Sequence, residues 1–168
     1  GPTQNAKDAQ DAQAMAELIR ARGGTVVATG GCFDLLHRGH VTVLEQARQL
    51  GDCLIVCLND DASVTRLKGH PRPLVDQRDR AAVLEALACV DGVVVFAEDT
   101  PAEALSRLRP DFYVKGGDYG IENLPERAVV ESAGGKVVLL PYLDGRSTTG
   151  LIRRATCSTP ADATTRPA

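Results

Sequence analysis

Two histidines, His37 and His40, stand where the sequence passes from an apolar run to a helical pattern. Residues 26–28 predict a short buried strand, and residues 41–50 repeat apolar side chains at helical spacing. A helix N-terminus has unpaired backbone N–H groups and a positive dipole end, both of which suit an anionic phosphate. Gly39, between the histidines, would let a ligand approach the backbone closely. This turn therefore predicts a site that handles phosphate.

Three further polar segments come after predicted strands and contain groups that bind phosphates or sugars. They read L-K-G at 67–69, K-G-G-D-Y at 115–119 and R-S-T-T at 146–149. The hydroxyls of the third could equally cap the last helix, and capping is compatible with ligand binding. Ligands of parallel sheets bind beyond the carboxyl ends of the strands, so we expect all these segments at one rim.

The elements that must position these residues alternate between strand and helix. This alternation predicts an α/β, Rossmann-like single domain, with a five-stranded, mostly parallel sheet and helices on both faces. In the helix that follows Asp76, we expect Ala82, Val83, Leu84 and Leu87 to face inward. The expected strands are 26–28, 53–59, 93–96, 111–115 and 136–140, and the expected helices are 12–22, 41–50, 61–66, 76–88, 100–108, 125–133 and a last one ending at 154.

The 168 residues suffice for one domain with a sizeable core. We expect the α/β domain to span 25–155. Residues 1–24 would be a scar of protease cleavage followed by a linker helix, and the sequence leaves open whether an upstream domain has been removed. Residues 156–168 are rich in Thr, Ala and Pro, which predicts a disordered tail.

The composition is that of a soluble globular protein, with 43% hydrophobic and 24% charged residues. The net charge of −3 and the lack of a basic block argue against a nucleic-acid partner. No apolar run approaches the roughly 20 residues that span a bilayer, and no signal peptide is recognisable, so we expect a cytoplasmic protein without a membrane partner.

The five cysteines are odd in number and form no C-x-x-C pair, which favours reduced thiols in the core. A zinc site built from Cys53, Cys57 and either His37 or His40 is the alternative. We disfavour this metal-binding redox reading, because neither the spacing nor the strand geometry matches known zinc frameworks. Zinc measured on the purified protein would revive it.

The usual nucleotide motifs are absent: there is neither G-x-x-x-x-G-K-[ST] nor G-x-G-x-x-G after the first strand. No serine lies in a nucleophile elbow, and no cysteine stands beside a histidine in a catalytic pattern. What remains is two histidines, several cationic side chains and helix N-termini. Such groups stabilise charge in phosphoryl or nucleotidyl transfer, where positioning and electrostatics do nearly all the work.

Four motifs together carry a family resemblance over about residues 25–154. G-C-F-D-L-L-H-R-G-H resembles the signature of the H-x-G-H nucleotidyltransferase superfamily, and R-S-T-T-G-L-I resembles the second signature of its cytidylyltransferase-like branch. L-N-D-D-A-S-V-T-R-L-K-G-H-P-R-P-L and V-K-G-G-D-Y are similar to the D-glycero-D-manno-heptose 1-phosphate adenylyltransferases. In many bacteria that activity is the second domain of a bifunctional kinase/adenylyltransferase.

The resemblance implies that AMP passes from ATP to a heptose 1-phosphate by direct in-line attack, giving ADP-heptose and pyrophosphate. His37, His40 and Lys68 would be catalytic, the histidines by stabilising charge on the five-coordinate phosphorus, and Mg²⁺ would neutralise the phosphates. The implied nucleotide-binding residues are Gly31, Cys32, Phe33, His37, Gly39, His40, Arg78, Gly116, Asp118, Arg146, Ser147 and Thr148, and those for the sugar phosphate are Asp34, Lys68 and Lys115.

Two other functions remain open from the sequence. One is a CTP-dependent cytidylyltransferase for glycerol 3-phosphate or a similar small phosphate, because base choice does not follow from spacing. The other is a non-catalytic nucleotide-binding module that regulates a partner. Neither the sugar isomer nor the pathway is determined. Dimers are common among similar enzymes, so a homodimer is expected, as is a fused or separate heptose kinase.

Overall fold

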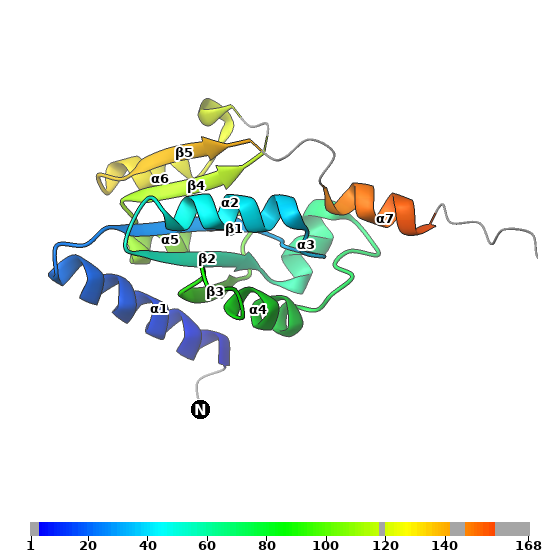
Figure 1. Cartoon of the computed structure of the whole chain (residues 1–168), viewed down its shortest axis with the longest axis horizontal. Coiled ribbons are helices and arrows are strands. Elements are labelled where there is room, and N and C mark those ends of the chain that lie inside the picture. The colour runs from blue at the N-terminus through cyan, green and yellow to red at the C-terminus, as the bar shows by residue number, and fades with distance from the viewer. Residues whose placement is uncertain (1–3, 118–119, 142–146, 157–168) are drawn as a thin grey trace, which may run out of the picture.

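The computed structural model describes residues 4–117, 120–141 and 147–156 of the chain (Figure 1). Its centre is one five-stranded sheet with strand order β3-β2-β1-β4-β5, in which every pair is parallel. This confirms the predicted fold class and all five strands, although β1 is longer than expected. The strands are β1 Val26–Gly31, β2 Cys53–Asn59, β3 Gly92–Phe96, β4 Phe112–Gly116 and β5 Lys136–Leu140.

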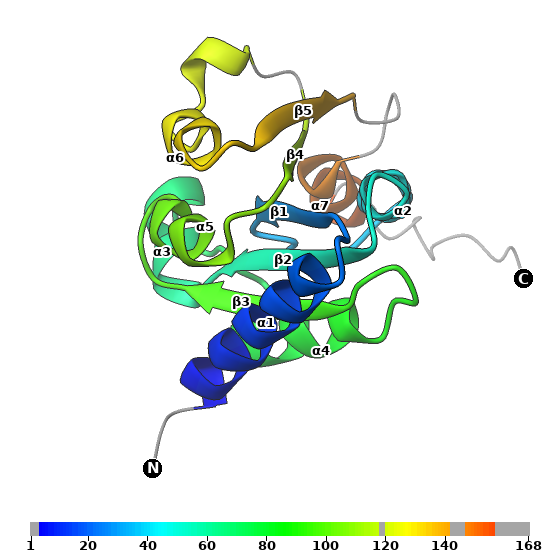
Figure 2. The ribbon, with the colours of Figure 1, turned by 90° about the vertical axis from the view of Figure 1, so that its left-hand side faces the viewer.

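Helices cover both faces of the sheet (Figure 2). One core cluster joins a face of the sheet to α1, α5 and α6, and a second cluster joins the other face to α2 and α4. The helix α7 has no buried residue and lies beyond the sheet, near the start of α2 (Figure 1). The helices are α1 Gln4–Ala21, α2 Arg38–Arg48, α3 Asp61–Lys68, α4 Gln77–Glu85, α5 Ala102–Leu108, α6 Arg127–Ser132 and α7 Thr148–Thr156, with a 3-10 turn, η1, at Ile121–Asn123.

The side chains of β2 show why this run of apolar residues forms a central strand. Successive strand residues point to opposite faces, so Ile55 and Cys57 enter the α1 side of the core while Leu54 and Val56 enter the α2 side. All seven residues of β2 are buried. A strand covered on both faces cannot alternate apolar with polar residues, and the sequence accordingly reads as apolar almost throughout.

The expected linker helix is longer than predicted and belongs to the packing of the domain. Its side chains Ala12 and Ala16 are buried in the core against β3 and β1. The guanidinium of Arg20 donates hydrogen bonds to the backbone carbonyls of Leu108 and Arg109 at the end of α5. The small side chains of these alanines allow the helix to lie close to the sheet. A prediction based on the spacing of large apolar residues does not detect such a contact.

The prediction for the inward face of α4 is wrong in part. Ala82 and Val83 are exposed, whereas Leu84 is buried as expected. The buried partner of Leu84 one turn earlier is Arg80. A prediction from apolar residues alone places an arginine on the exposed face of a helix. The predicted inward face of α4 therefore included Ala82 and Val83 and left out Arg80.

No helix in the part of the chain that the structure describes is long and apolar enough to cross a membrane.

Candidate functional site

A cavity of about 480 Å³ opens at the carboxyl ends of the strands, where the sequence analysis expects a ligand. The opening segment contributes Gly31, Cys32, Phe33, Asp34, His37 and His40 to its lining. Later segments contribute Lys68, Lys115, Gly116, Ser147 and Thr148. The structure thus brings together residues that lie more than a hundred positions apart in the chain. Their individual roles toward a ligand stay predictions.

Two of the predicted residues that the structure describes do not join this group. Gly39 and Arg78 are absent from the lining, and Arg78 is exposed near the start of α4. Asp118 and Arg146 lie outside the described residues.

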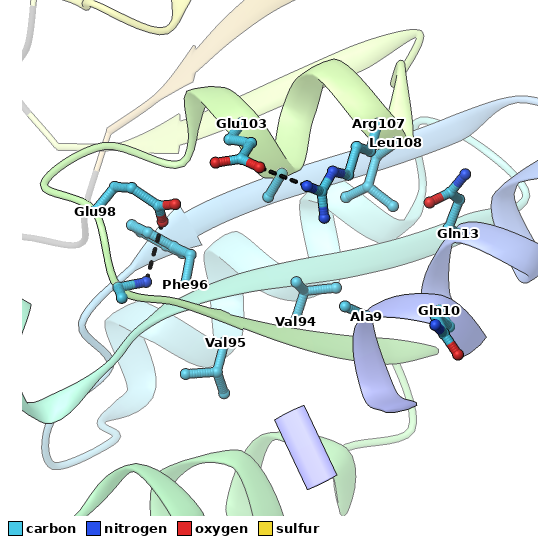
Figure 3. Close-up of a pocket in the computed structure, with 12 residues that line it drawn as sticks. Ala9, Gln10, Gln13, Val94, Val95, Phe96, Glu98, Glu103, Arg107 and Leu108 are labelled. Carbon is cyan, nitrogen blue, oxygen red and sulfur yellow. Dashed lines mark hydrogen bonds and ion pairs between the residues drawn. The ribbon is translucent and has the colours of Figure 1, made fainter. Parts of the chain in front are cut away.

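A second, smaller pocket of about 290 Å³ lies between α1, β3 and α5 (Figure 3). Its rim is polar at Gln13, Glu98 and Arg107, and Arg107 forms an ion pair with Glu103 of the same helix. None of the residues predicted to act on a ligand lines it. The chemistry of the motifs therefore belongs to the larger cavity.

The two histidines form one unit at the start of α2. Their rings are stacked, with centroids 3.8 Å apart and planes inclined by 26°. His37 is the N-cap residue, and its Nδ1 accepts a hydrogen bond from the backbone N–H of Gly39 at 3.1 Å. The backbone N–H of His37 donates to Nδ1 of His40 at 3.4 Å. The arrangement is a reciprocal capping box, built from imidazoles instead of the usual Ser/Thr and Glu/Gln.

These hydrogen bonds determine which ring nitrogen carries hydrogen. In a neutral imidazole one nitrogen donates and the other accepts. Because Nδ1 accepts in both His37 and His40, the hydrogen of the neutral ring is on Nε2 in each. Both histidines line the cavity, so the tautomer suits donation to an oxygen of a bound phosphate.

This geometry corrects the simple picture of an open helix N-terminus. The backbone N–H groups of His37 and Gly39 are occupied by the imidazoles. A phosphate would therefore meet Nε2–H groups in place of those two amides. The positive end of the helix dipole still acts on it, through the rings.

Burial lowers the pKa of His40 to about 4, with a smaller contribution from the neighbouring His37. Only 8% of His40 is exposed. At neutral pH the His40 ring is therefore uncharged, and it can stabilise developing charge as a hydrogen-bond donor but not as a cation.

The lowered pKa of His40 predicts a pH-dependent stability. Protonation below its usual pKa of 6.5 favours the unfolded chain, so this contribution is present above about pH 6.5 and is lost as the pH falls toward about 4. We expect the free energy of unfolding to fall by about 2 kcal/mol from this group between pH 7 and pH 5. Denaturant unfolding of H40Q should lack that part of the decrease, since Gln at this position keeps a capping acceptor.

The control for this measurement is H70Q, because His70 is the exposed histidine of the loop after α3. This variant removes an exposed imidazole and so controls for the replacement of a histidine as such. An H40Q variant that loses as much stability as the unchanged protein between pH 7 and pH 5 would contradict the assignment.

Asp34 holds the loop that follows α3 against the segment that follows β1. Its carboxylate accepts hydrogen bonds from Nε of Arg72 at 2.6 Å and from the backbone N–H groups of Leu74 and Val75 at 2.9 and 3.0 Å. Burial alone would raise the pKa of Asp34, but these hydrogen bonds outweigh it and lower the pKa. The geometry gives Asp34 a structural task, while its role beside the sugar phosphate stays a prediction.

Arg80 ties together the segments that form the cavity wall. Its guanidinium donates to the backbone carbonyls of Cys32 at 2.7 Å, Asn59 at 2.8 Å and Val75 at 2.8 Å, and to a carboxylate oxygen of Asp61 at 2.8 Å. The residue is 2% exposed. The buried arginine of α4 is therefore Arg80, whereas Arg78, the predicted nucleotide contact, is exposed.

The second signature meets the first at the start of α7. The hydroxyl of Ser147 accepts a hydrogen bond from the backbone N–H of Gly150 at 2.9 Å and so caps the helix. The hydroxyl of Thr148 donates to the carbonyl of Leu35 at 3.3 Å. Leu35 has a φ of 51° and Phe33 a φ of 45°, which is left-handed backbone uncommon outside glycine. The segment before the histidines is thus tightly turned, and Thr148 holds it to α7.

The cysteines do not provide a nucleophile in the described structure. Burial raises the pKa of Cys32, although nearby cations, Lys68 first among them, oppose the increase. Burial raises the pKa of Cys57 to about 12. Both thiols therefore stay protonated at neutral pH. Within the described ranges, no cluster of three or more His, Cys, Asp or Glu side chains could hold a metal ion.

Sequence reasoning missed several residues of the cavity. Arg72, Asn59 and Glu126 line it, and none of the three was predicted as a site residue. Asn59 and Arg72 both lie within the quoted segment L-N-D-D-A-S-V-T-R-L-K-G-H-P-R-P-L, so their place in a motif was a usable signal. For Glu126 the signal is weaker, because a glutamate before a helix is usually a solvated residue.

A family model described as cytidylyltransferase-like matches residues 28–139. The bifunctional protein HldE of Streptomyces coelicolor is 61% identical over 148 residues, which cover 88% of this chain and 32% of that protein. The bifunctional protein HldE of Syntrophotalea carbinolica is 57% identical over 138 residues, covering 82% of this chain and 28% of that protein. The chain thus spans about a third of the length of these curated relatives.

A solved structure has a similar fold. The crystal structure of the lipopolysaccharide core biosynthesis protein from Thermoplasma volcanium matches with a TM-score of 0.58 at 27% identity, covering 71% of this chain and 97% of that chain. The family match, the relatives and this shared fold confirm the resemblance carried by the motifs. The chain belongs to the cytidylyltransferase-like family of nucleotidyltransferases.

Proposed function

We propose that this chain transfers AMP from ATP to a D-glycero-D-manno-heptose 1-phosphate, giving ADP-heptose and pyrophosphate. The observation that carries the proposal is the stacked pair His37 and His40, which line the same cavity as Lys68 and Ser147. The Nδ1 atom of each histidine accepts a backbone hydrogen bond. The heptose branch is supported by the R-L-K-G and K-G-G-D-Y motifs. It is also supported by the relatives named HldE and by the neighbour named for lipopolysaccharide core biosynthesis.

The reaction is a single displacement at the α-phosphorus of ATP. An oxygen of the sugar phosphate attacks and forms the new P–O bond, while the bond to the β-phosphate oxygen breaks and pyrophosphate leaves. The attacking phosphate is already ionised, so no general base is required. The Nε2–H groups of His37 and His40 would donate to the oxygens of the α-phosphate as negative charge increases there.

Lys68 and the start of α7 would act on the departing phosphates. Lys68 lines the cavity from the last residue of α3, and Ser147 and Thr148 line it from the start of α7. A lysine ammonium neutralises phosphate charge, and the hydroxyls can donate to the β- and γ-phosphate oxygens.

Mg²⁺ is part of this proposal as a companion of the triphosphate. Two of the three acidic residues in the described lining, Asp34 and Asp99, already accept hydrogen bonds from Arg72 and Arg66, and the third is Glu126. No group of three or more His, Cys, Asp or Glu among the described residues could hold a metal ion, so Mg²⁺ would be carried mainly by phosphate oxygens. When bound, it neutralises charge on the triphosphate and on pyrophosphate.

The measurement that tests this function is pyrophosphate release with ATP, CTP, GTP and UTP, each paired with heptose 1-phosphate and with glycerol 3-phosphate. We expect the fastest release from ATP with heptose 1-phosphate. The cytidylyltransferase-like family match favours a second candidate, CTP with glycerol 3-phosphate, and fastest turnover of that pair would overturn the heptose proposal. Release from no pair would favour a nucleotide-binding regulatory module.

A kinase that phosphorylates the anomeric oxygen of a heptose would supply the second substrate. The relatives are called bifunctional and are about three times as long as the matched region. We propose that such a kinase works with this chain, fused or separate, and that the chain forms a homodimer.

A further inference from the structure

One buried side chain of the cavity lacks a hydrogen-bond partner on one of its atoms. Glu126 is 4% exposed and lines the cavity. Its Oε1 accepts a hydrogen bond from the hydroxyl of Tyr113 at 3.5 Å. Its Oε2 is the one buried side-chain oxygen or nitrogen without a partner among the residues that the structure describes. Leaving a carboxylate oxygen buried and unsatisfied is costly, so a missing donor is the simplest explanation.

The surroundings of Glu126 place it at the α5 and α6 side of the cavity. A side chain at Gly30 would approach the hydroxyl of Tyr113 to 2.8 Å and Pro101 to 3.3 Å. Gly30, Pro101 and Glu126 all line the cavity. The absence of a side chain at Gly30 therefore leaves space at the end of β1 beside Tyr113 and Pro101. The histidines begin α2, which covers the other face of the sheet.

The two sides of the cavity differ in chemistry. His37, His40 and Lys68 offer donors and positive charge for phosphates. The segments that precede Glu126 and Pro101 in the chain contribute the carboxamide of Asn123 and the hydroxyl of Thr100, which both donate and accept, and β4 contributes Lys115. A carboxylate only accepts, and it repels phosphate, so the ligand group facing Glu126 must be an O–H or N–H donor.

We propose that Glu126 is a specificity-determining residue that binds hydroxyls of the acceptor's neutral, sugar part. This inference rests on the proposed function. Two neighbouring hydroxyls present two donors, which match the two oxygens of one carboxylate. The pairing edge of adenine or cytosine presents a donor beside an acceptor nitrogen, and that acceptor would face the second oxygen unfavourably. The carboxylate therefore suits two neighbouring hydroxyls better than it suits a base, and because the ribose of ATP also has such a pair, the effects on ATP and on the sugar phosphate must be measured separately.

The test compares E126Q with E131Q, in which the same change is made at an exposed glutamate of α6. Initial rates of pyrophosphate release give KM for ATP and for heptose 1-phosphate separately. We expect E126Q to raise KM for the sugar phosphate at least tenfold, as for a lost hydrogen bond to a charged group, with KM for ATP within threefold. E131Q should leave both values unchanged. An effect of E126Q on ATP alone, or on neither substrate, would overturn the proposal.

A second measurement remains decisive if E126Q also weakens the fold. Heptose 1-phosphates that lack single hydroxyls are compared as substrates of the unchanged protein and of E126Q. With the unchanged protein, kcat/KM for the analogue that lacks the bound hydroxyl should be at least tenfold lower than for heptose 1-phosphate. With E126Q, kcat/KM for that analogue and for heptose 1-phosphate should be nearly equal. Equal losses in both proteins for every analogue would overturn the proposal.

Failure of the proposed function would show separately, in the unchanged protein. If it turned over glycerol 3-phosphate but not heptose 1-phosphate, the same comparison of E126Q and E131Q with that acceptor would decide the role of Glu126. If it turned over no acceptor, both the function and the role of Glu126 would be overturned.

Discussion

Replacing His37 with asparagine should lower kcat for pyrophosphate release by two or more orders of magnitude. The imidazole Nε2–H is a donor aimed at charge that develops in the transition state, and loss of one such donor typically costs that much. Asparagine is a good N-cap residue, so H37N keeps an acceptor for the N–H of Gly39 while removing the ring. The measurement is the initial rate at saturating ATP and heptose 1-phosphate.

The control is H70N at the exposed third histidine, which should retain the kcat of the unchanged protein. Because the rings of His37 and His40 are stacked at 3.8 Å, they act at one place. The double variant H37N/H40Q should therefore lose less than the product of the two single losses. A kcat of H37N within tenfold of the unchanged protein would refute a transition-state role for this ring.

Replacing Arg80 with methionine should lower the free energy of unfolding by about 3–5 kcal/mol. The methionine side chain keeps much of the buried volume but leaves the carbonyls of Cys32, Asn59 and Val75 without the guanidinium. Buried acceptors that lose their donors cost far more than an exposed contact does. Denaturant unfolding at neutral pH gives the difference.

R78M is the matched control, because Arg78 is an exposed arginine one half-turn earlier in the same helix. We expect R78M to change the unfolding free energy by no more than about 0.5 kcal/mol. A similar decrease in the free energy of unfolding for R78M and R80M would mean that the hydrogen bonds of Arg80 to the other segments do not stabilise the fold. R78M also tests the predicted nucleotide contact, since loss of that contact would raise KM for ATP.

The fold class could be predicted from the sequence because the patterns that indicate strands and helices lie within short segments of the chain. A run such as Cys53–Asn59 must be buried on both faces, and alternation with helices leaves a parallel sheet as the natural solution. The rim was predictable for the same reason, since the carboxyl ends of parallel strands share an edge. The order of the strands was not, because it depends on contacts between distant segments such as β1 with β4.

Buried polar residues were the harder part of the site. Arg80 is inside because acceptors from other segments surround it, and a pattern of apolar residues cannot report those acceptors. The hydrogen bonds of the two histidines were likewise hidden. Spacing predicted a helix over 41–50, directly after the histidines, whereas α2 begins at Arg38, and the use of both Nδ1 atoms as caps depends on side-chain rotation. Glu126 is of the same kind, since its burial comes from tertiary contacts.

The strand order also bears on how the chain assembles as it is synthesised. β1 is first in the sequence yet central in the sheet, and β2 and β3 add to one of its edges before β4 and β5 add to the other. Each new strand thus meets a neighbour that already exists, and none of the five must insert between two paired strands. Among the described lining residues, Ser147, Thr148 and Thr149 are synthesised last, so both imidazoles and all five strands of the sheet precede them. The lining of the cavity is therefore complete only after the start of α7 has been synthesised.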